Sequence, residues 1–560
     1  MKSRSVSLIA IFAGLMMIGS GCSTVVDDDD ASFDDDTAET SSELKRDKDK
    51  DKGKGKDKDK DKGKDKDKGK KGVKLSVAGT FKTNGSIEIT AFDECSNRLF
   101  SVNSVVNQIE VVDISNPRKP KGITTIPIDD GIPNSVAIHD GLLAVAVQAL
   151  ERTDPGHVRF YDTKTLRLLQ KVGVGAVPDN VVFTPNGKRL LVANEGEPAD
   201  DYVFDPEGSV SIIDVTRPRG HFTAKTARFL PSTPMKNADS IRIFGPGSTP
   251  AQDFEPEYIA ISDDSKTAWV TLQENNAIGI IDIEKAKVEA VVGLGFKDHS
   301  KPGNGLDASD RDGVLANIKT WPIFGMYQPD TIHHYKVKGK DYLVTVNEGD
   351  AREWGSYAEE ARIKDLVAAG KIDPSHPIIT QGLGTDDKLG RLTVTSVTGD
   401  TDGDGDLDRI YAYGARSFSI WNANGSQVFD SGDDLERRLA TLVPGMANAD
   451  QTPDPAPDSR SDNKGPEPEA LALGELKGRT YAFVGLERIG GIMVYDIEDP
   501  KKPSFVTYFN NRNFSDPANP GDLGPEGLLF IPAKDSPNHK PLLVVSNEIS
   551  GTLTILNIDD

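Results

Sequence analysis

The sequence lacks most of the motifs by which enzymes are recognised. Only two of its 560 residues are cysteines, Cys22 and Cys95, and its eight histidines show no metal-ligand spacing. No serine-elbow motif, Cys–His pair, phosphate-binding P-loop or dinucleotide fingerprint is present. These absences exclude the function classes that such motifs mark.

Basic residues are also in deficit. The chain has 66 Lys and Arg against 88 Asp and Glu, which gives a formal net charge of -22. Residues 1–44 and 45–71 carry charges of -7 and +7 that cancel, so residues 72–560 carry the whole excess. An acidic body repels nucleic acid and anionic membrane surfaces and suits cations or basic partners. We expect no nucleic-acid partner, although the charge could simply keep a secreted protein soluble.

The N-terminus carries an export signal. An apolar run over residues 6–18 follows Lys2 and Arg4 and is too short to span a membrane. The segment 1–22 resembles a bacterial lipoprotein signal, in which the cysteine at the cleavage point, here Cys22, is lipidated. Gly19 departs from that pattern, which prefers Leu, so ordinary secretion is the alternative. We expect an exported, lipid-anchored protein of the bacterial envelope, and no structural disulfide because Cys95 has no partner left.

Residues 23–72 have the composition of a disordered tether. An acidic block over residues 27–36 precedes a nearly alternating Lys/Asp/Gly run from Lys45 to Lys71. Such a segment has too few apolar residues to bury a core and stays solvated. It is typical of a spacer between an anchor and a folded body, and a cation- or mineral-binding tail is the alternative.

The rest of the chain repeats one phrase: a proline, an acidic or amide residue, a strand, a tight turn and a second strand. Recurrence at this spacing predicts the four-stranded blades of a β-propeller over residues 73–560. Seven or eight blades fit, because residues 389–432 read as an irregular eighth unit. The strand at 74–81 is expected to complete the last blade. The repeated phrase begins at Pro133-Asn134, Pro178-Asp179, Pro256-Glu257, Pro329-Asp330, Pro468-Glu469 and Pro525-Glu526, and Glu88 opens a copy without proline.

Four long insertions interrupt the repeats, at about 217–252, 293–327, 352–388 and 433–464. Insertions of this length on a rigid scaffold are common places for binding loops.

The segment from Gly399 to Asp408 predicts a calcium site. Carboxylates at alternating positions, with glycines that permit a sharp bend, match the opening of a calcium loop. The departure from an EF-hand is Tyr411, which stands at loop position twelve in place of a bidentate Glu. An Asp-Gly hairpin turn, the alternative, would use only one or two of these acids. The expected ligands are Asp400, Asp402, Asp404, Asp406 and Asp408.

A second acidic loop, residues 305–313, is a weaker metal candidate. Asp307, Asp310 and Asp312 could supply ligands there, but Arg311 could equally pair with them.

Superposition of the repeats would line one end of the central channel with acids and amides. Crowded carboxylates cannot all stay ionised without a cation or raised pKa values. A cation site, or a catalytic pocket at the channel mouth, is one interpretation; side chains that bond the turns of neighbouring blades are the other. The expected lining residues are Glu88, Asn134, Asp179, Glu257, Asp330, Glu469 and Glu526. The catalytic candidates beside the second strands and insertions are Glu195, Glu348, Glu487, Glu548, Arg352 and Arg488.

Long motifs in the chain resemble the choice-of-anchor I domain family, a group of YVTN-type β-propellers. They are residues 194–214, 242–260, 295–313, 460–470, 485–496 and 521–530. The resemblance covers roughly residues 74–560 and implies an exported propeller held at a cell surface. It extends to the mesenchyme-specific cell surface glycoproteins of animal biomineralisation. Some members carry an alkaline-phosphatase label, and residues 525–528 are similar to a phrase of phytase-like propellers.

Two functional hypotheses follow. The first is a surface-anchored, calcium-binding propeller that binds a cation, a surface polymer, a protein or a mineral without catalysis. The second is a calcium-dependent phosphoric-ester hydrolase that uses channel-mouth carboxylates, with Arg352 or Arg488 on the phosphate and calcium activating water. The tether, the anchor and the evenly repeated acids favour the first.

Overall fold

The computed structural model describes residues 72–216 and 220–559. The signal peptide at 1–22 with Cys22, and the tether at 23–72 apart from its last residue, lie outside the described residues. Within the described residues, no helix is both long enough and apolar enough to cross a membrane.

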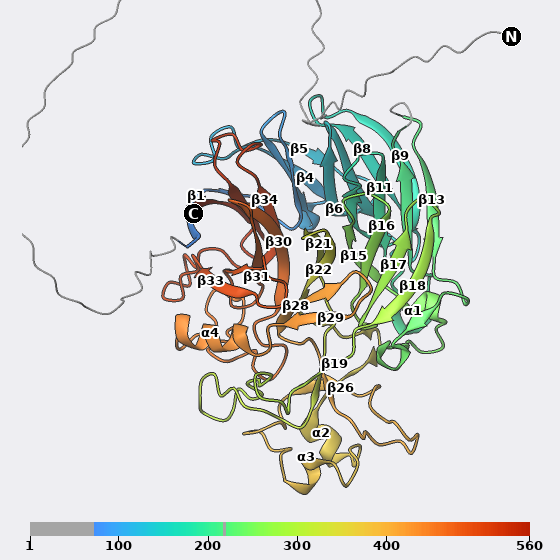
Figure 1. Ribbon diagram of the computed structural model, residues 1–560, viewed down its shortest axis with the longest axis vertical. Helices are drawn as coiled ribbons and strands as arrows, with labels where there is room; N and C mark the ends of the chain where they lie inside the picture. Colours follow the sequence, from blue (N-terminus) through green and yellow to red (C-terminus); the bar gives the residue numbers. More distant parts are fainter. Residues whose placement is uncertain (1–71, 217–219, 560) are drawn as a thin grey trace, which may run out of the picture. The chain divides into compact units, whose positions relative to one another are not determined.

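Strands dominate residues 72–559, and most belong to antiparallel sheets in which consecutive strands are neighbours (Figure 1). The part of the chain that the structure describes contains seven such sheets, whereas the repeats predict seven or eight blades. The first three are β2 (Thr90–Asp93), β3 (Arg98–Asn103), β4 (Gln108–Asp113) and β5 (Lys121–Pro127); β6 (Ile132–His139), β7 (Leu142–Gln148), β8 (Pro155–Asp162) and β9 (Leu168–Ala176); and β10 (Pro178–Phe183), β11 (Arg189–Asn194), β12 (Ser209–Asp214) and β13 (Thr223–Arg228).

Three further sheets continue the series. The fourth is β15 (Pro256–Ile261), β16 (Thr267–Leu272), β17 (Ala277–Asp282) and β18 (Lys287–Gly293), with β14 (Met235–Lys236) added in parallel. The fifth is β21 (Ile332–Val337), β22 (Lys340–Asn347), β28 (Ser417–Asn422) and β29 (Gln427–Asp430). The sixth is β30 (Pro468–Leu476), β31 (Arg479–Leu486), β32 (Ile492–Asp496) and β33 (Ser504–Phe509).

The seventh sheet joins the two ends of the folded unit. It consists of β34 (Pro525–Ile531), β35 (Leu542–Asn547), β36 (Thr552–Asp559) and the N-terminal strand β1 (Lys74–Lys82). The pairing of β1 with β36 runs from Lys74 opposite Asp559 to Lys82 opposite Thr552. The expectation that the first strand completes the last blade is confirmed, and it covers an edge that β36 would otherwise expose.

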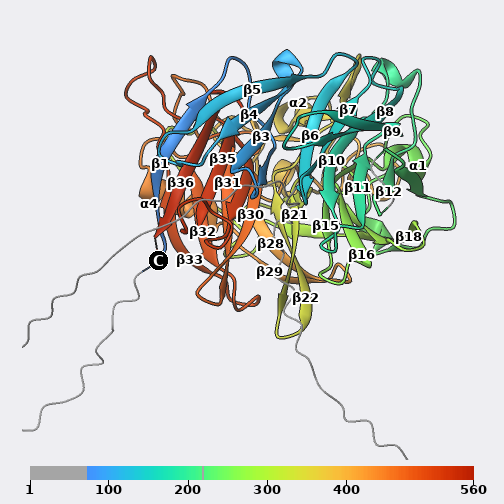
Figure 2. The ribbon, with the colours of Figure 1, turned by 90° about the horizontal axis from the view of Figure 1, so that it is seen from above.

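The sheets close into a ring through their first strands. Each first strand contacts the first strand of the next sheet, in the order β2, β6, β10, β15, β21, β30, β34 and back to β2. In Figures 1 and 2 the labelled strands β6, β15, β21 and β30 gather around the middle of this unit. The predicted β-propeller fold is therefore confirmed.

The core lies between adjacent sheets. In β7, Leu143, Val145 and Val147 pack toward the first sheet, whereas Leu142, Ala144 and Ala146 pack toward the third. Successive side chains of a strand point to opposite faces, so a strand between two sheets is apolar on both. This explains the nearly continuous apolar second strands of the repeats.

The expected eighth hairpin does not form a blade. The strand at Ser417–Asn422 pairs with β22 and completes the fifth sheet, across an insertion of residues 348–416. The other two strands of the expected unit are short and belong to a separate mixed sheet, in the order β19 (Phe296–Asp298), β20 (Phe324–Met326), β27 (Tyr411–Ala412), β26 (Thr393–Thr395) and β25 (Glu360–Arg362).

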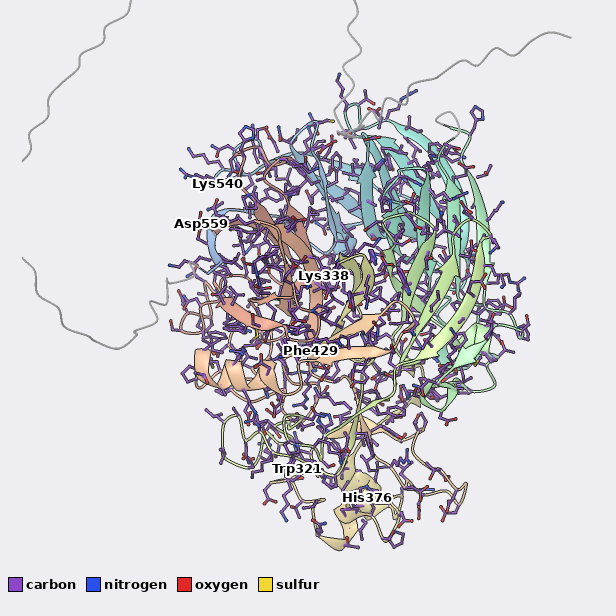
Figure 3. All side chains as sticks on the ribbon, in the orientation of Figure 1. Trp321, Lys338, His376, Phe429, Lys540 and Asp559 are labelled. Atoms are coloured by element: carbon purple, nitrogen blue, oxygen red, sulfur yellow. The ribbon has the colours of Figure 1, made fainter. Side chains whose placement is uncertain are left out.

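The insertions between β18 and β21 and between β22 and β28 therefore form a packed lobe. Its own core includes Leu306, Trp321, Ile363 and Leu407, and Trp321 and His376 are labelled in this region of Figure 3. The remaining elements are the hairpin β23 (Glu353–Trp354) with β24 (Tyr357–Ala358), the helices α1 (Pro250–Asp253), α2 (Ile363–Ala368), α3 (Pro377–Thr380) and α4 (Asp434–Leu442), and the 3-10 turns η1 (Ser104–Val106), η2 (Asp200–Tyr202) and η3 (Ala238–Ser240).

One expectation about covalent structure is wrong. Cys95 is disulfide-bonded, whereas the sequence analysis expected no disulfide. Its partner lies outside the described residues.

Candidate functional site

The ring of first strands brings the repeated acids together. Each sheet contributes one residue, at or just before the start of its first strand: within the first three positions in five sheets, and two residues before the strand for Glu88 and Asp330. A cavity of about 240 Å³ lies among them. Its described lining includes six carboxyl side chains and no basic one: Glu88, Asp179, Glu195, Glu257, Asp330 and Glu526, with Asn134, Asn180, Ser135, Tyr258 and Ile89. Six of the seven expected channel residues thus line one cavity.

Glu469, the seventh expected residue, does not appear in this lining but belongs to the same electrostatic group. Burial and the neighbouring carboxyls of Glu487 and Glu526 raise its pKa well above the usual range.

Crowding in a confined space shifts the titration of these acids upward. Burial, reinforced by nearby carboxylates, raises the pKa of Asp179 to about 7 and that of Asp330 to about 8. The same causes raise the pKa values of Glu195, Glu257 and Glu526 well above their usual range. Desolvation and like-charge repulsion both penalise the ionised form. The cavity must therefore bind protons, a cation, or both at neutral pH.

Two of these carboxyl groups have an oxygen without a hydrogen bond. Glu257 Oε2 and Glu469 Oε2 are buried atoms for which the described residues supply no donor. A buried acceptor without a partner costs about 1–3 kcal/mol. A bound cation or ordered water would remove that cost.

The asparagine side chains at the ends of the second strands make hydrogen bonds within their own sheets. Asn194 Nδ2 donates to Ser211 Oγ at 3.1 Å, and Asn347 Nδ2 donates to Ser419 Oγ at 2.9 Å. Both asparagines are fully buried. These side chains connect the second strand of a sheet to the third and have a structural role.

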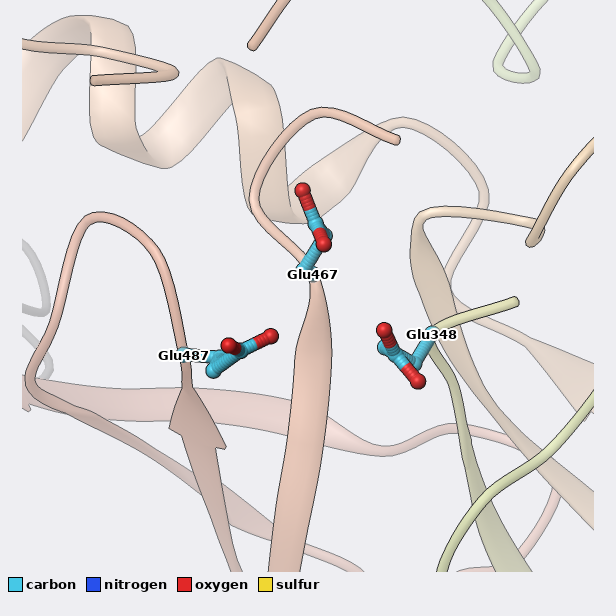
Figure 4. Close-up of side chains that lie close together, drawn as sticks. All are labelled: Glu348, Glu467 and Glu487. Carbon is cyan, nitrogen blue, oxygen red and sulfur yellow. The ribbon is translucent and has the colours of Figure 1, made fainter. Parts of the chain in front are cut away.

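Three more glutamates form a cluster at the ends of strands of the fifth and sixth sheets (Figure 4). Oxygen atoms of Glu348, Glu467 and Glu487 lie within 4.8 Å of one another. Glu348 follows β22, Glu467 precedes β30 and Glu487 follows β31. All three are buried. The sequence analysis identified Glu348 and Glu487 but missed Glu467, which lies one residue before a Pro-acid phrase and outside the repeat pattern.

Basic side chains already occupy this cluster. Lys464 Nζ lies 2.5 Å from Glu348 Oε1 and 3.4 Å from Glu467 Oε2. Arg460 and Arg488 contact Glu467 at 2.6 and 2.9 Å, and Arg488 contacts Glu487 at 3.0 Å. Burial disfavours the ionised form of Glu467, but attraction to these three cations lowers its pKa below the usual value. The Lys464 ammonium thus stands where a metal ion would bind.

The other arginine candidate is also engaged. The Arg352 side chain is 1% exposed and pairs with Asp253 and with Glu255, the latter at 3.1 Å. It acts as a structural counter-ion between the insertion and α1, which is one of the two roles that the sequence analysis allowed. Glu548 is half-buried, and burial raises its pKa.

The five aspartates of the 399–408 loop lie between β26 and β27 in the inserted lobe. Carboxyl oxygens of Asp400, Asp402 and Asp408 form one group within 4.8 Å. Asp406 and Asp408 form a second group with Asp373, which the sequence analysis missed because it lies in the segment before α3. Asp404 Oδ1 instead accepts a hydrogen bond from the backbone N–H of Asp406 at 3.1 Å. Calcium coordination by this loop stays a prediction.

The three aspartates of the weaker metal candidate, the loop at residues 305–313, have different surroundings. Asp310 pairs with Arg391 at 2.9 Å and with Arg311 at 3.2 Å, as the alternative to metal binding required. Asp312 accepts the backbone N–H of Val314 at 2.8 Å. Asp307 is fully buried and accepts a hydrogen bond from the backbone N–H of Asn317 at 2.7 Å.

Comparison with known proteins gives the family. The profile of the choice-of-anchor I domain matches residues 88–500, more than half of the chain. The chain belongs to the choice-of-anchor I domain family. Gigasin-3a of Magallana gigas is 30% identical over 184 residues, which are 30% of this chain and 64% of that protein. The mesenchyme-specific cell surface glycoprotein of Strongylocentrotus purpuratus is 27% identical over 279 residues, 44% of this chain and 35% of that protein. The chain thus spans less than two thirds of either relative.

Solved structures resemble this choice-of-anchor I protein only distantly. Hydrazine synthase of Kuenenia stuttgartiensis gives a TM-score of 0.43 at 14% identity over 85% of this chain and 96% of that one. The β-propeller domain of Cps50 (Swd1) from Myceliophteria thermophila gives 0.43 at 10% identity over 87% and 100%. The fold assignment rests on the strand pairing of the chain itself.

The ion pairs of Glu467 give a testable prediction. We expect Glu467→Gln to destabilise the protein by about 3–5 kcal/mol, because it leaves buried cations with one anion fewer. The contribution of a carboxyl with a lowered pKa is present above its unfolded pKa and is lost as the pH falls through the folded value. The loss should therefore be largest near neutral pH in chemical denaturation. Glu475→Gln, at an exposed position of β30, should change stability by less than about 0.5 kcal/mol.

Proposed function

We propose that this protein is an exported, surface-associated binding protein whose propeller binds cations. Membership of the choice-of-anchor I family and similarity to a protein named as a cell surface glycoprotein support the surface location. The single observation that carries the binding role is the cavity at the hub, where six carboxyl side chains converge and the described lining contains no basic one. A divalent cation, or a cationic group on a polymer, protein or mineral, complements that charge.

Calcium is the cation that we propose for the 399–408 loop. Asp400, Asp402, Asp406 and Asp408, together with Asp373, offer the hard oxygen ligands that Ca²⁺ prefers. Asp406 Oδ1 is buried and has no hydrogen-bond partner among the described residues, which leaves it available as a ligand. There the ion would connect the β26–β27 loop to the segment before α3.

We propose attachment to the membrane through a lipid at Cys22, which lies outside the described residues. The chain has two cysteines, and Cys95 is disulfide-bonded. Secretion without a lipid is the alternative.

Binding is preferred over phosphoric-ester hydrolysis because the basic groups are engaged elsewhere. A phosphate ester needs cationic groups or a metal beside the nucleophile. Arg352 is buried in ion pairs with Asp253 and Glu255, and Arg488 pairs with Glu467 and Glu487. No contact of these side chains favours a phosphoryl site.

The calcium loop is tested by chelation. We expect removal of calcium to lower the melting temperature and to increase amide hydrogen exchange in residues 371–376 and 399–412. Ligand at 100 times its Kd stabilises a site by about 2.7 kcal/mol. Asp400→Asn with Asp408→Asn should abolish both effects, and Asp454→Asn, at an exposed position, should preserve them. Identical calorimetric calcium titrations of the wild type and the double variant would contradict the assignment.

The hub is tested by its dependence on pH. Carboxyls with raised pKa values hold more protons in the folded than in the unfolded state, so stability falls as pH rises from about 4 to about 8. In a protein without the loop acids, we expect the melting temperature to fall over this range in chelator and to recover at pH 8 with calcium. Asp330→Asn should reduce the fall, because burial raises the pKa of this residue to about 8. A fall of equal size in Asp330→Asn, with no response to calcium, would sink the cation role.

Hydrolysis is tested with a chromogenic phosphate monoester. We expect the same background rate from the wild type, the wild type in chelator and Glu487→Gln. Turnover that requires calcium and disappears in Glu487→Gln would establish the hydrolase instead.

A further inference from the structure

Four exposed apolar side chains share the end of the propeller at which the hub acids lie. The start of each first strand pairs with the end of the second strand, for example Pro178 with Asn194 and Pro525 with Asn547. The loops from second to third strands therefore lie at the same end as the hub cavity. Among the described residues, the four most exposed large apolar side chains are all on these loops in the first three sheets: Val105 at 70%, Leu150 at 74%, Val203 at 80% and Phe204 at 58%. We call these four residues the apolar rim.

The loops that carry the apolar rim begin beside the cavity. In the first sheet, Ser104 opens the loop and donates a hydrogen bond to Glu88. In the second sheet, Gln148 ends β7 and accepts a hydrogen bond from Asn134 Nδ2 at 3.3 Å. In the third sheet, Glu195 opens the loop and itself lines the cavity. Single exposed apolar side chains are common on any protein, but several that gather about one polar pocket are typical of a binding surface.

Arginine side chains elsewhere in the protein indicate which group such a pocket suits. Arg152 Cζ lies 4.2 Å from the centre of the Trp354 ring, and Arg152 Nε lies 3.7 Å from Glu197 Oε2. Arg352 Cζ lies 4.6 Å from the centre of the Phe244 ring, and its guanidinium makes the ion pairs described above. Each guanidinium thus contacts both an aromatic face and a carboxylate, and both groups attract a delocalised cation.

The hub cavity offers the same two kinds of group, with no basic side chain in its described lining. Tyr258 is half-buried and is the aromatic residue of that lining. Burial and the nearby carboxyls of Asp330 and Asp179 raise the pKa of Tyr258, so its ring lies among the acids. The cavity therefore has the aromatic ring and the anions of an arginine site and lacks the arginine.

The size of the cavity and the spacing of its acids favour an extended cation. Its volume of about 240 Å³ has room for roughly eight water molecules at about 30 Å³ each. In the part of the chain that the structure describes, three groups of three carboxyls have oxygens within 4.8 Å of one another, and none includes a residue of the cavity lining. A compact metal ion would therefore contact few of these carboxyls directly. A guanidinium presents several N–H donors in a planar fork on an apolar stem, so it reaches more acceptors and fills more space.

We propose that this end of the propeller binds a protein partner that inserts an arginine side chain into the hub cavity and packs apolar side chains against the apolar rim. The inference rests on the proposed cation-binding role of the hub and names the source of the cation. The Lys-rich run at residues 45–71 of this chain is a poorer match, because it contains no apolar side chain. Apolar neighbours of the arginine would exclude water from the cavity and strengthen its ion pairs.

A peptide array tests the class of ligand, with the full chain in chelator. Each immobilised peptide has a central Arg, Lys, citrulline or Glu flanked by one of all pairs of natural residues. We expect the strongest binding from Arg between apolar residues, weaker binding from Lys, and none from citrulline, which keeps the shape of Arg without its charge. Absence of binding to every Arg peptide would overturn the proposal. Equal binding of the Lys or citrulline peptides, or of chitosan oligomers that carry ammonium groups on a polysaccharide, would also overturn it.

Variants test the position of the peptide, with fluorescence anisotropy of the best Arg peptide as the measurement. Glu257→Gln should weaken binding about tenfold or more, the effect of one charge-assisted hydrogen bond. Leu150→Ser should weaken it about threefold or more, because part of an apolar contact is lost. Glu475→Gln and Leu442→Ser are the matched controls, at exposed positions outside the hub and the apolar rim, and should leave the affinity unchanged. Unchanged affinity in either Glu257→Gln or Leu150→Ser would overturn the proposal.

The melting temperature separates loss of the site from loss of the fold. Burial and neighbouring carboxyls disfavour the ionised form of Glu257 and raise its pKa. Glu257→Gln should therefore melt at pH 8 at least as high as the wild type. If it melts lower, the surface variant Leu150→Ser decides the outcome.

The result is separable from that of the calcium experiment on the hub. Peptide binding without a calcium response at pH 8 supports this proposal and removes calcium from the hub. A calcium response without peptide binding supports the cation role and overturns this proposal. The loop at residues 399–408 affects neither result, because the peptides are measured in chelator.

Discussion

Closure of the first strands into one ring is the constraint on which the rest of the structure depends. Once β2, β6, β10, β15, β21, β30 and β34 each contact two neighbours, the residues at the start of these strands must share one small volume. In this protein the repeated residue there is acidic in six sheets and an amide in the seventh. Burial of apolar side chains between the sheets stabilises the fold. This stabilisation offsets the free-energy cost of crowding carboxyl groups at the hub.

The acids of the protein are treated in two different ways. Around Glu467, the buried carboxylates pair with Lys464, Arg460 and Arg488. At the hub, the described contacts leave one oxygen of Glu257 and one of Glu469 without a donor. The contrast separates acids that complete a structure from acids that are available to a ligand.

Features that repeat locally along the chain can be predicted well from the sequence. The sequence could place five of the hub acids together, because each belongs to the same repeated phrase and the ring of first strands brings the phrases to one place. These residues are Glu88, Asp179, Glu257, Asp330 and Glu526. Asp373 and Glu467 could not be placed, because they lie in insertions whose paths depend on packing against the lobe and α4. The interpretation of residues 389–432 as an eighth unit was wrong for a related reason. In the sequence β28 looks like part of a local unit, but its partner strand β22 lies before the insertion. The alternation of apolar and polar residues predicts that a segment is a strand, but it does not predict which strand it pairs with.

The register of β1 has a mechanical implication. Lys74, which stands opposite Asp559, is at the outer corner of the last sheet, and chain from the N-terminal side enters the fold there. A pull transmitted along that chain acts first on this terminal pair and then on successive pairs toward Lys82, one after another. Opening of the propeller under tension would begin with the separation of β1 from β36. The first strands at the hub would separate only after that pair had come apart.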